Sequence, residues 1–162
     1  MKLYASVAFA TGALALVASS LALAQGNPTS RMICNSLGGN ALEPLPDGRA
    51  LQVISLSCRV EMGPMAQGVM TGSQIYEFQG PNGSHLAGEG VVRSPAGVLV
   101  YRTDEGTTTL KMADGKVVGA ASSGRGVYRS AYGSVAGFAG KSYSYKTMAT
   151  GLNQFVIEVT DD

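Results

Sequence analysis

One histidine and a nearby carboxylate are the residues of this 162-residue chain best suited to acid–base chemistry. His85, Ala87 and Glu89 alternate along a segment with strand character, so an uninterrupted strand would place all three on one face. A histidine and a carboxylate two pleats apart form a general acid–base pair if that face lines a cavity, and do nothing if it faces solvent. His85 and Glu89 are therefore the candidate catalytic residues. No Gly-x-Ser-x-Gly motif surrounds a serine, so nucleophilic catalysis is not supported.

Sulfur-bearing side chains suggest a copper site as a second kind of chemistry, because thioethers and thiolates suit Cu(I). The chain offers two cysteines and, beside His85, the methionines Met32, Met62, Met65 and Met70. Their spacing matches no metal motif, and Met62 completes the apolar face of a strand. Filling of the core accounts for these residues, so we expect no metal and no cofactor.

Tyrosine and glycine dominate residues 122–145, SSGRGVYRSAYGSVAGFAGKSYSY. In uninterrupted strands Tyr128 and Tyr132 share one face, and Tyr143 and Tyr145 share another. Such faces pack against a neighbouring sheet or line a partly polar pocket, because tyrosine has an apolar ring and a hydrogen-bonding tip. These four tyrosines are the candidate ligand-binding residues, with plain packing as the alternative. The Gly-Arg-Gly within the segment lacks the third glycine of a dinucleotide fingerprint, so no phosphate site is indicated.

Strands must position these side chains, because period-two alternation runs through much of the chain. In ISLSCRVEM, residues 54–62, every second residue is apolar and those between are serine or charged. Turn signals punctuate the sequence, among them Pro81-Asn82-Gly83, Asp104-Glu105-Gly106 and the hairpin marker Asp114-Gly115. Further strands are expected at 69–78, 85–93, 98–103, 107–112, 117–121, 126–132, 142–148 and 152–159.

This punctuation predicts an all-β domain over residues 50–160. An antiparallel up-and-down barrel of about eight strands is favoured over a two-sheet sandwich, because closure removes exposed edges and glycines fall inside strands as at barrel bends. Residues 25–49 contain three prolines and no lasting period, so we expect a loop-rich segment there.

The first 24 residues have the features of a signal peptide. Lys2 is followed by an apolar stretch, and Ala22-Leu23-Ala24 precedes the expected cleavage site. No basic stop-transfer cluster follows, so we expect a periplasmic or secreted protein without a membrane attachment. In such an oxidising compartment Cys34 and Cys58 are expected to form a disulfide, two buried free thiols being the alternative.

Charge narrows the choice of partners. The chain has 12 lysines and arginines against 11 aspartates and glutamates, and the signs are interspersed. A nucleic-acid binder would carry a basic stripe and a binder of anionic membranes a basic cluster, so neither partner is expected.

Residues 124–145 resemble a motif of the allene-oxide-cyclase-like and dirigent-like β-barrels. A glycine-bearing strand leads to a G-x-x-x-G-x-x-G corner, here Gly133, Gly137 and Gly140, and a strand returns. The rhythm of sequential strands from about Leu51 is similar as well. The resemblance implies an eight-stranded, often oligomeric barrel whose cavity holds small apolar molecules and in some members guides a cyclisation or coupling. It therefore raises the expectation of a homo-oligomer, but carries over no catalytic residue.

The function expected from these features is binding of a small, largely apolar ligand inside an exported barrel. Glycine, serine and alanine are plentiful while tryptophan is absent, which favours a hollow interior over a filled one. A cyclase- or isomerase-type enzyme that uses Tyr128, Tyr132 and Glu89 to position a substrate is one alternative, although the sequence favours no catalysis. A structural or interaction module of the cell envelope, with a solidly packed barrel, is the other.

Overall fold

The computed structural model describes residues 28–38, 41–114, 116–151 and 153–162. The signal peptide expected over residues 1–24 lies outside these residues. The elements are β1 (Ser30–Leu37), β2 (Glu43–Pro44), β3 (Arg49–Met62), β4 (Val69–Gln79), β5 (Asn82–Ser94), β6 (Gly97–Ala113), β7 (Lys116–Gly133), the 3₁₀ helix η1 (Ala136–Phe138), β8 (Ser142–Gly151) and β9 (Gln154–Asp161). Within the described ranges, no helix has the length and apolar character needed to span a membrane.

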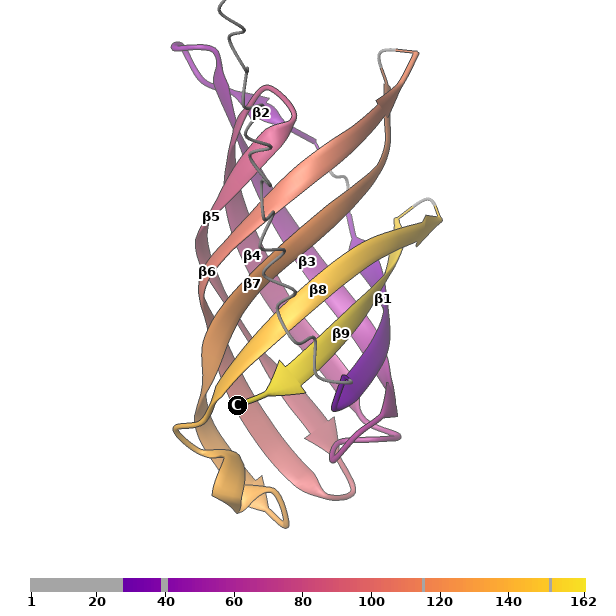
Figure 1. Ribbon diagram of the computed structural model, residues 1–162, viewed down its shortest axis with the longest axis vertical. Coiled ribbons are helices and arrows are strands. Elements are labelled where there is room, and N and C mark those ends of the chain that lie inside the picture. Colours follow the sequence, from indigo (N-terminus) through magenta and orange to yellow (C-terminus); the bar gives the residue numbers. More distant parts are fainter. Residues whose placement is uncertain (1–27, 39–40, 115, 152) are drawn as a thin grey trace, which may run out of the picture.

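Eight strands form a closed antiparallel barrel (Figure 1). From β3 to β9 each strand pairs with the next one in the sequence, and β1 pairs with both β9 and β3, which closes the sheet. The short β2 pairs only with β3, outside this circle. The predicted up-and-down barrel is confirmed, and the sandwich is wrong because β1 leaves no free sheet edge between β9 and β3.

The seam between β1 and β3 carries the disulfide. Cys34 lies directly opposite Cys58 in the register of these strands, and their sulfur atoms are bonded. Both residues are buried, so the predicted disulfide is confirmed and lies in the core. Cross-linking residues 24 positions apart stabilises the fold by about 3 kcal/mol through the unfolded chain.

Strand β1 lies where the sequence indicates only loop. Its inner face carries Ser30 and Ser36 at the two ends and Met32 and Cys34 between them. Ile33 points to the other face. Polar residues inside and an apolar residue outside remove the period that would have marked the strand. Strand β3 by contrast follows its prediction.

Strands β6 and β7 form one long hairpin of 17 and 18 residues (Figure 1). The turn expected at Asp104-Glu105-Gly106 is wrong, since these residues lie within β6. A bulge makes Asp104 the extra residue of β6, and its carboxylate accepts a hydrogen bond from Arg102 at 2.6 Å outside the barrel. The true turn of the hairpin contains Asp114, whose φ of 50° agrees with the hairpin marker in the sequence.

The two ends of the barrel differ. At the end that carries η1, which we call the closed end, Met65 and Val135 from the connections are only 4% and 3% exposed (Figure 1). They belong to the main apolar core, with Val60, Val92 and Leu99 of the strands. The opposite end, where the hairpins β4–β5, β6–β7 and β8–β9 turn, is called the mouth. These buried apolar side chains therefore close this end of the barrel.

Candidate functional site

The half of the barrel toward the mouth is hollow. Its cavity has a volume of about 720 Å³, within the range of about 300–1,000 Å³ typical of small-molecule sites. The lining residues that keep partial exposure come from β1, β3, β6, β7, β8 and β9: Ser36, Ile54, Leu110, Gly119, Ala120, Ser122, Tyr145, Thr147, Ala149 and Phe155. The site is thus a cup whose floor is the packed core.

One part of the rim is apolar and another is polar. Leu42, Val117 and Val118 line the cavity near the mouth, and Val118 is 62% exposed. Asn153 and Gln154, beside the turn between β8 and β9, line it as well. An apolar molecule that reaches the opening therefore has an apolar path into the cup along the β6–β7 hairpin.

The lining is uncharged. Among the residues that the structure describes, neither a histidine nor a lysine, arginine, aspartate or glutamate lines the cavity. Its polar members are hydroxyls and amides, such as Gln52, Gln74, Thr103, Thr108 and Ser122. An ion held in the cup would therefore find hydrogen bonds but no opposite charge.

Glycines on the inner face hold the tyrosine rings against the wall. Tyr101 of β6 pairs with Gly90 of β5, and a side chain at either Gly90 or Gly72 of β4 would collide with the Tyr101 hydroxyl. The ring thus lies across one neighbouring strand and ends at the next. Burial raises the pKa of Tyr101 above its ordinary value.

The same arrangement recurs on the other side of the barrel. Tyr145 of β8 pairs with Gly124 of β7, and a Cβ atom at Gly106 of β6 would lie 2.6 Å from the Tyr145 hydroxyl. Tyr143 pairs with Gly126, and its hydroxyl donates to the carbonyl oxygen of Arg102 at 3.2 Å. Because these rings lie along the wall, the barrel can contain several tyrosines and still be hollow.

The glycines of the connection between β7 and β8 have a different role. Gly133 and Gly140 have φ values of 78° and 82°, a region that favours glycine, and Gly137 lies in η1. The expected strand, corner and returning strand are therefore present. Glycines inside strands were expected to mark bends of the barrel. Gly72, Gly90, Gly106, Gly124 and Gly126 instead leave room for a tyrosine ring.

Three of the four candidate tyrosines line the cavity: Tyr128, Tyr143 and Tyr145. The prediction for Tyr132 is wrong, because its side chain is 62% exposed and does not line the cavity. Tyr101 pairs with Tyr128 while Val100 pairs with Ser130, so one extra residue of β7 forms a bulge. The bulge reverses the alternation beyond it and turns Tyr132 outward.

Tyr128 lies at the closed end and has a structural partner. Its hydroxyl donates to the carboxylate of Asp161 at 2.7 Å, and its ring packs edge-on against Phe138 with ring centres 5.7 Å apart. Burial, and then the neighbouring carboxylate, raise the pKa of Tyr128. This tyrosine fastens β7 to the end of β9 below the cup.

The acid–base pair expected from His85 and Glu89 does not form. Tyr76 pairs with His85 and Ile75 with Ala87, so a bulge in β5 places His85 and Glu89 on opposite faces. Glu89 is exposed on the outer face, where it lies opposite Arg102 in the register of β5 and β6.

His85 is half-buried behind the cavity wall. Its Nε2 donates to Oε1 of Gln74 at 2.8 Å, and its ring meets Tyr76 edge-on with ring centres 5.4 Å apart. Burial lowers the pKa of His85, which favours the neutral ring. Both Gln74 and Tyr76 line the cavity and stand between His85 and the hollow, so His85 holds Gln74 in place.

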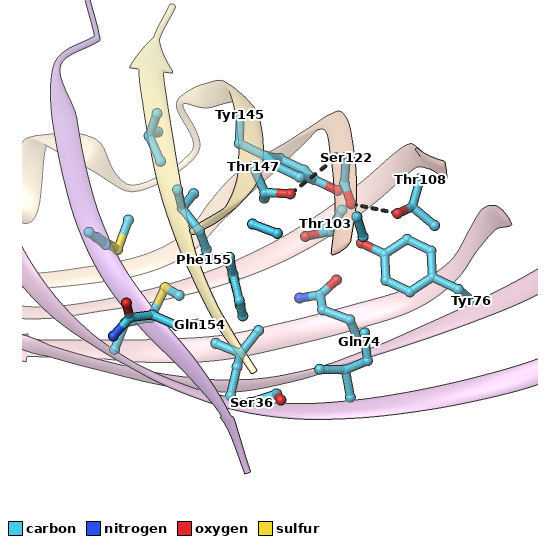
Figure 2. A pocket seen from close by; sticks show the side chains of 18 of the residues that line it. Ser36, Gln74, Tyr76, Thr103, Thr108, Ser122, Tyr145, Thr147, Gln154 and Phe155 are labelled. Atoms are coloured by element: carbon cyan, nitrogen blue, oxygen red, sulfur yellow. Dashed lines mark hydrogen bonds between the residues drawn. The ribbon is translucent and has the colours of Figure 1, made fainter. Parts of the chain in front are cut away.

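A row of hydroxyl groups crosses three neighbouring strands and was not predicted from the sequence. Thr108 of β6 pairs with Ser122 of β7, which pairs with Thr147 of β8; we call these three residues the hydroxyl row. Ser122 Oγ donates to Thr108 Oγ1 at 2.8 Å, and the Ser122 amide donates to Thr147 Oγ1 at 3.1 Å (Figure 2). Single serines and threonines within strands carry no signal that would have singled them out.

The Tyr101 and Tyr145 hydroxyls are buried, and among the described residues neither makes a hydrogen bond of normal geometry. Each still interacts with one polar neighbour, Gln74 for Tyr101 and Tyr76 for Tyr145. Tyr145 and Tyr76 lie close to Ser122 in Figure 2, beside Gln74. Burial raises the pKa of Tyr145, so its hydroxyl stays protonated at neutral pH. The polar part of the cavity is thus neutral throughout.

Metal ligands do not gather in the part of the chain that the structure covers: it brings no three histidine, cysteine, aspartate or glutamate side chains close enough to hold an ion. Met65 and Met70 are buried in the core, and Met62 is 43% exposed at the end of β3.

Comparison with known proteins gives no further guide, because no family model, curated protein or solved structure matches this chain.

Proposed function

We propose that this protein binds one small, largely apolar molecule in the hollow half of its barrel. The observation that carries the proposal is the cup of about 720 Å³, with its largely apolar and uncharged lining. Eight-stranded barrels are either filled by their own side chains or hold one small ligand. Here the tyrosines lie over glycines and leave the space open.

The alternatives fit less well. In an enzyme of the cyclase or isomerase type a proton donor or acceptor would face the substrate, whereas His85 lies behind Gln74 and Glu89 lies outside the barrel. The tyrosines of the lining are kept protonated at neutral pH because burial raises their pKa values. A solidly packed envelope module would not leave half of the barrel empty. Binding is the function that uses the cup.

Export belongs to the same proposal. A buried disulfide persists in an oxidising compartment such as the periplasm or the extracellular space. The features of residues 1–24 point to the same location, and the likeness of residues 124–145 to cavity-forming barrels points to the same role.

The first test is native mass spectrometry of the protein purified from its own host, where we expect a co-purifying small molecule. The second is titration with the neutral apolar dye Nile red. The chain contains no tryptophan, so tyrosine emission reports directly on the barrel interior during the titration.

A matched pair of variants locates the binding site. Ala120 lines the cup, so Ala120→Phe should fill it and weaken dye binding by about tenfold or more. Ala87 is exposed on the outer face, so Ala87→Phe should leave binding unchanged. Failure of the dye to bind, or equal binding by both variants, would show that the cup is not a ligand site.

A further inference from the structure

The register of the strands arranges the wall of the cup in layers. In the layer nearest the mouth, Leu110 pairs with Ala120, and Ala149 pairs with Phe155. One layer deeper lies the hydroxyl row of Thr108, Ser122 and Thr147. The wall between β6 and β9 is therefore apolar in the first of these layers and polar in the next.

The hydrogen bonds within the hydroxyl row leave it able to bind a further group. Thr147 Oγ1 accepts from the Ser122 amide, so its own hydrogen remains to be donated. Ser122 Oγ gives its hydrogen to Thr108 and also contacts the Tyr76 hydroxyl, so one lone pair remains to accept. Ser122 and Thr147 both line the cavity and are partly exposed in it. Together they offer one donor and one acceptor side by side.

Charge is what the wall cannot accommodate. The described lining residues include no side chain that could pair with a carboxylate or an ammonium group. Moving an unpaired ion from water into such a site is far more costly than moving a hydroxyl that finds hydrogen-bond partners. His85 is the nearest side chain with a basic ring, but it is screened from the hollow by Gln74 and kept neutral by burial, which lowers its pKa.

We infer that the ligand is an uncharged amphipathic molecule that enters with its polar end first, so that a hydroxyl or carbonyl group binds the Ser122–Thr147 pair. Its hydrocarbon part then lies between Leu110, Ala120 and Phe155 and extends toward Val117 and Val118 at the rim. This inference rests on the proposed function and narrows it to one chemical class. Fatty acids and other amphiphilic ions with a similar hydrocarbon part are selected against.

Competition at neutral pH tests the charge rule with the full mature chain. Nile red is bound first and then displaced by 1-decanol, by decanoate or by decyltrimethylammonium, each below its micelle concentration. Both ions should displace the dye at least about tenfold less well than the alcohol. In acid, where decanoic acid is neutral, its competition should approach that of 1-decanol, whose own affinity serves as the control for an intact cup.

A pair of threonine variants tests the polar contact. Thr147→Val keeps the shape of the side chain and removes the hydroxyl, so 1-decanol should bind about threefold to tenfold more weakly. Thr107 is exposed on β6, and Thr107→Val should not change the affinity. Thermal unfolding of both variants verifies that they are folded.

The outcomes separate the two proposals. If Nile red does not bind, the proposed function fails and the inference fails with it. If the dye binds but decanoate competes as well as 1-decanol, the ligand class is wrong and the proposed function stands. Equal affinity of Thr147→Val and Thr107→Val for 1-decanol would overturn the assignment of the polar end to the hydroxyl row.

Discussion

Alkaline pH should unfold this barrel over a narrow range, because its interior holds several tyrosines in their neutral form. Burial raises the pKa values of five of them above the ordinary value of 10.0, and that of Tyr143 reaches about 12: Tyr76, Tyr101, Tyr128, Tyr143 and Tyr145. The unfolded chain ionises near pH 10, whereas the folded chain keeps these protons. The unfolded state therefore binds fewer protons above pH 10, and stability falls as the pH rises.

The size of the effect follows from this difference. Each such tyrosine removes about 1.4 kcal/mol of stability per pH unit between its unfolded and folded pKa values. The four most strongly shifted of the five, Tyr101, Tyr128, Tyr143 and Tyr145, remove on the order of 5 kcal/mol between about pH 10 and pH 11, which is comparable with the whole stability of a small domain. Below the unfolded pKa they contribute no pH dependence.

Urea unfolding followed by circular dichroism, at a series of pH values between about 8 and 11, measures the slope. Tyrosinate absorbance, undisturbed because tryptophan is absent, should rise together with the loss of structure. Tyr101→Phe should reduce the drop by about a quarter, and return to neutral pH verifies that the disulfide survived. In a Tyr132→Phe background, which removes the exposed tyrosine, gradual formation of tyrosinate near pH 10 in a fully folded protein would refute the reasoning.

Urea unfolding at neutral pH checks three further predictions. Tyr101→Phe should change stability by no more than about 1 kcal/mol, because the buried hydroxyl makes only a weak contact with Gln74; a larger loss would contradict this. Tyr128→Phe should cost about 1–3 kcal/mol, because Asp161 loses a donor at 2.7 Å, and an unchanged midpoint would argue against that bond. Replacing Cys34 and Cys58 together by alanine should cost about 2–5 kcal/mol, and reductant should then have no further effect on the variant.

The sequence predicted well wherever alternation and turn chemistry agree. The buried residues Leu56, Cys58 and Val60 of β3 alternate with the exposed Arg59 and Glu61, and the structure keeps that pattern. The division into strands was only partly right, because residues 98–103 and 107–112 form the single strand β6, residues 117–121 and 126–132 form β7, and β1 was not expected. The closure and the disulfide follow from the same local signals. These features depend on residues close together in the chain or on simple pairing of cysteines.

The bulges are what sequence reasoning could not supply. Leu86 in β5 and Arg129 in β7 are ordinary strand residues, yet each is the extra residue that reverses the alternation of its strand. Because of them, Glu89 and Tyr132 point outward although period two places them with His85 and Tyr128. A single unmarked insertion moves a candidate residue from inside the barrel to the solvent.

The hydroxyl row was missed for a different reason. Thr108, Ser122 and Thr147 are far apart in the sequence and come together only through the register of three strands. The same is true of each tyrosine and the glycine beneath it. The candidate site is a property of the pairing between strands, which no single segment contains.

The fit between tyrosines and glycines has a consequence for how the barrel chooses its pairing as it folds. On the inner face of β5, Gly90 is followed by Val92, so a slip of two residues in one direction would press the Tyr101 ring onto the Val92 side chain. A slip in the other direction leads to Gly88, where the Gln74 side chain already occupies the space. Each tyrosine ring and the space over its glycine therefore fit together in only one register. Strands whose backbones could hydrogen-bond equally well in several alignments are left with one that has room for the ring.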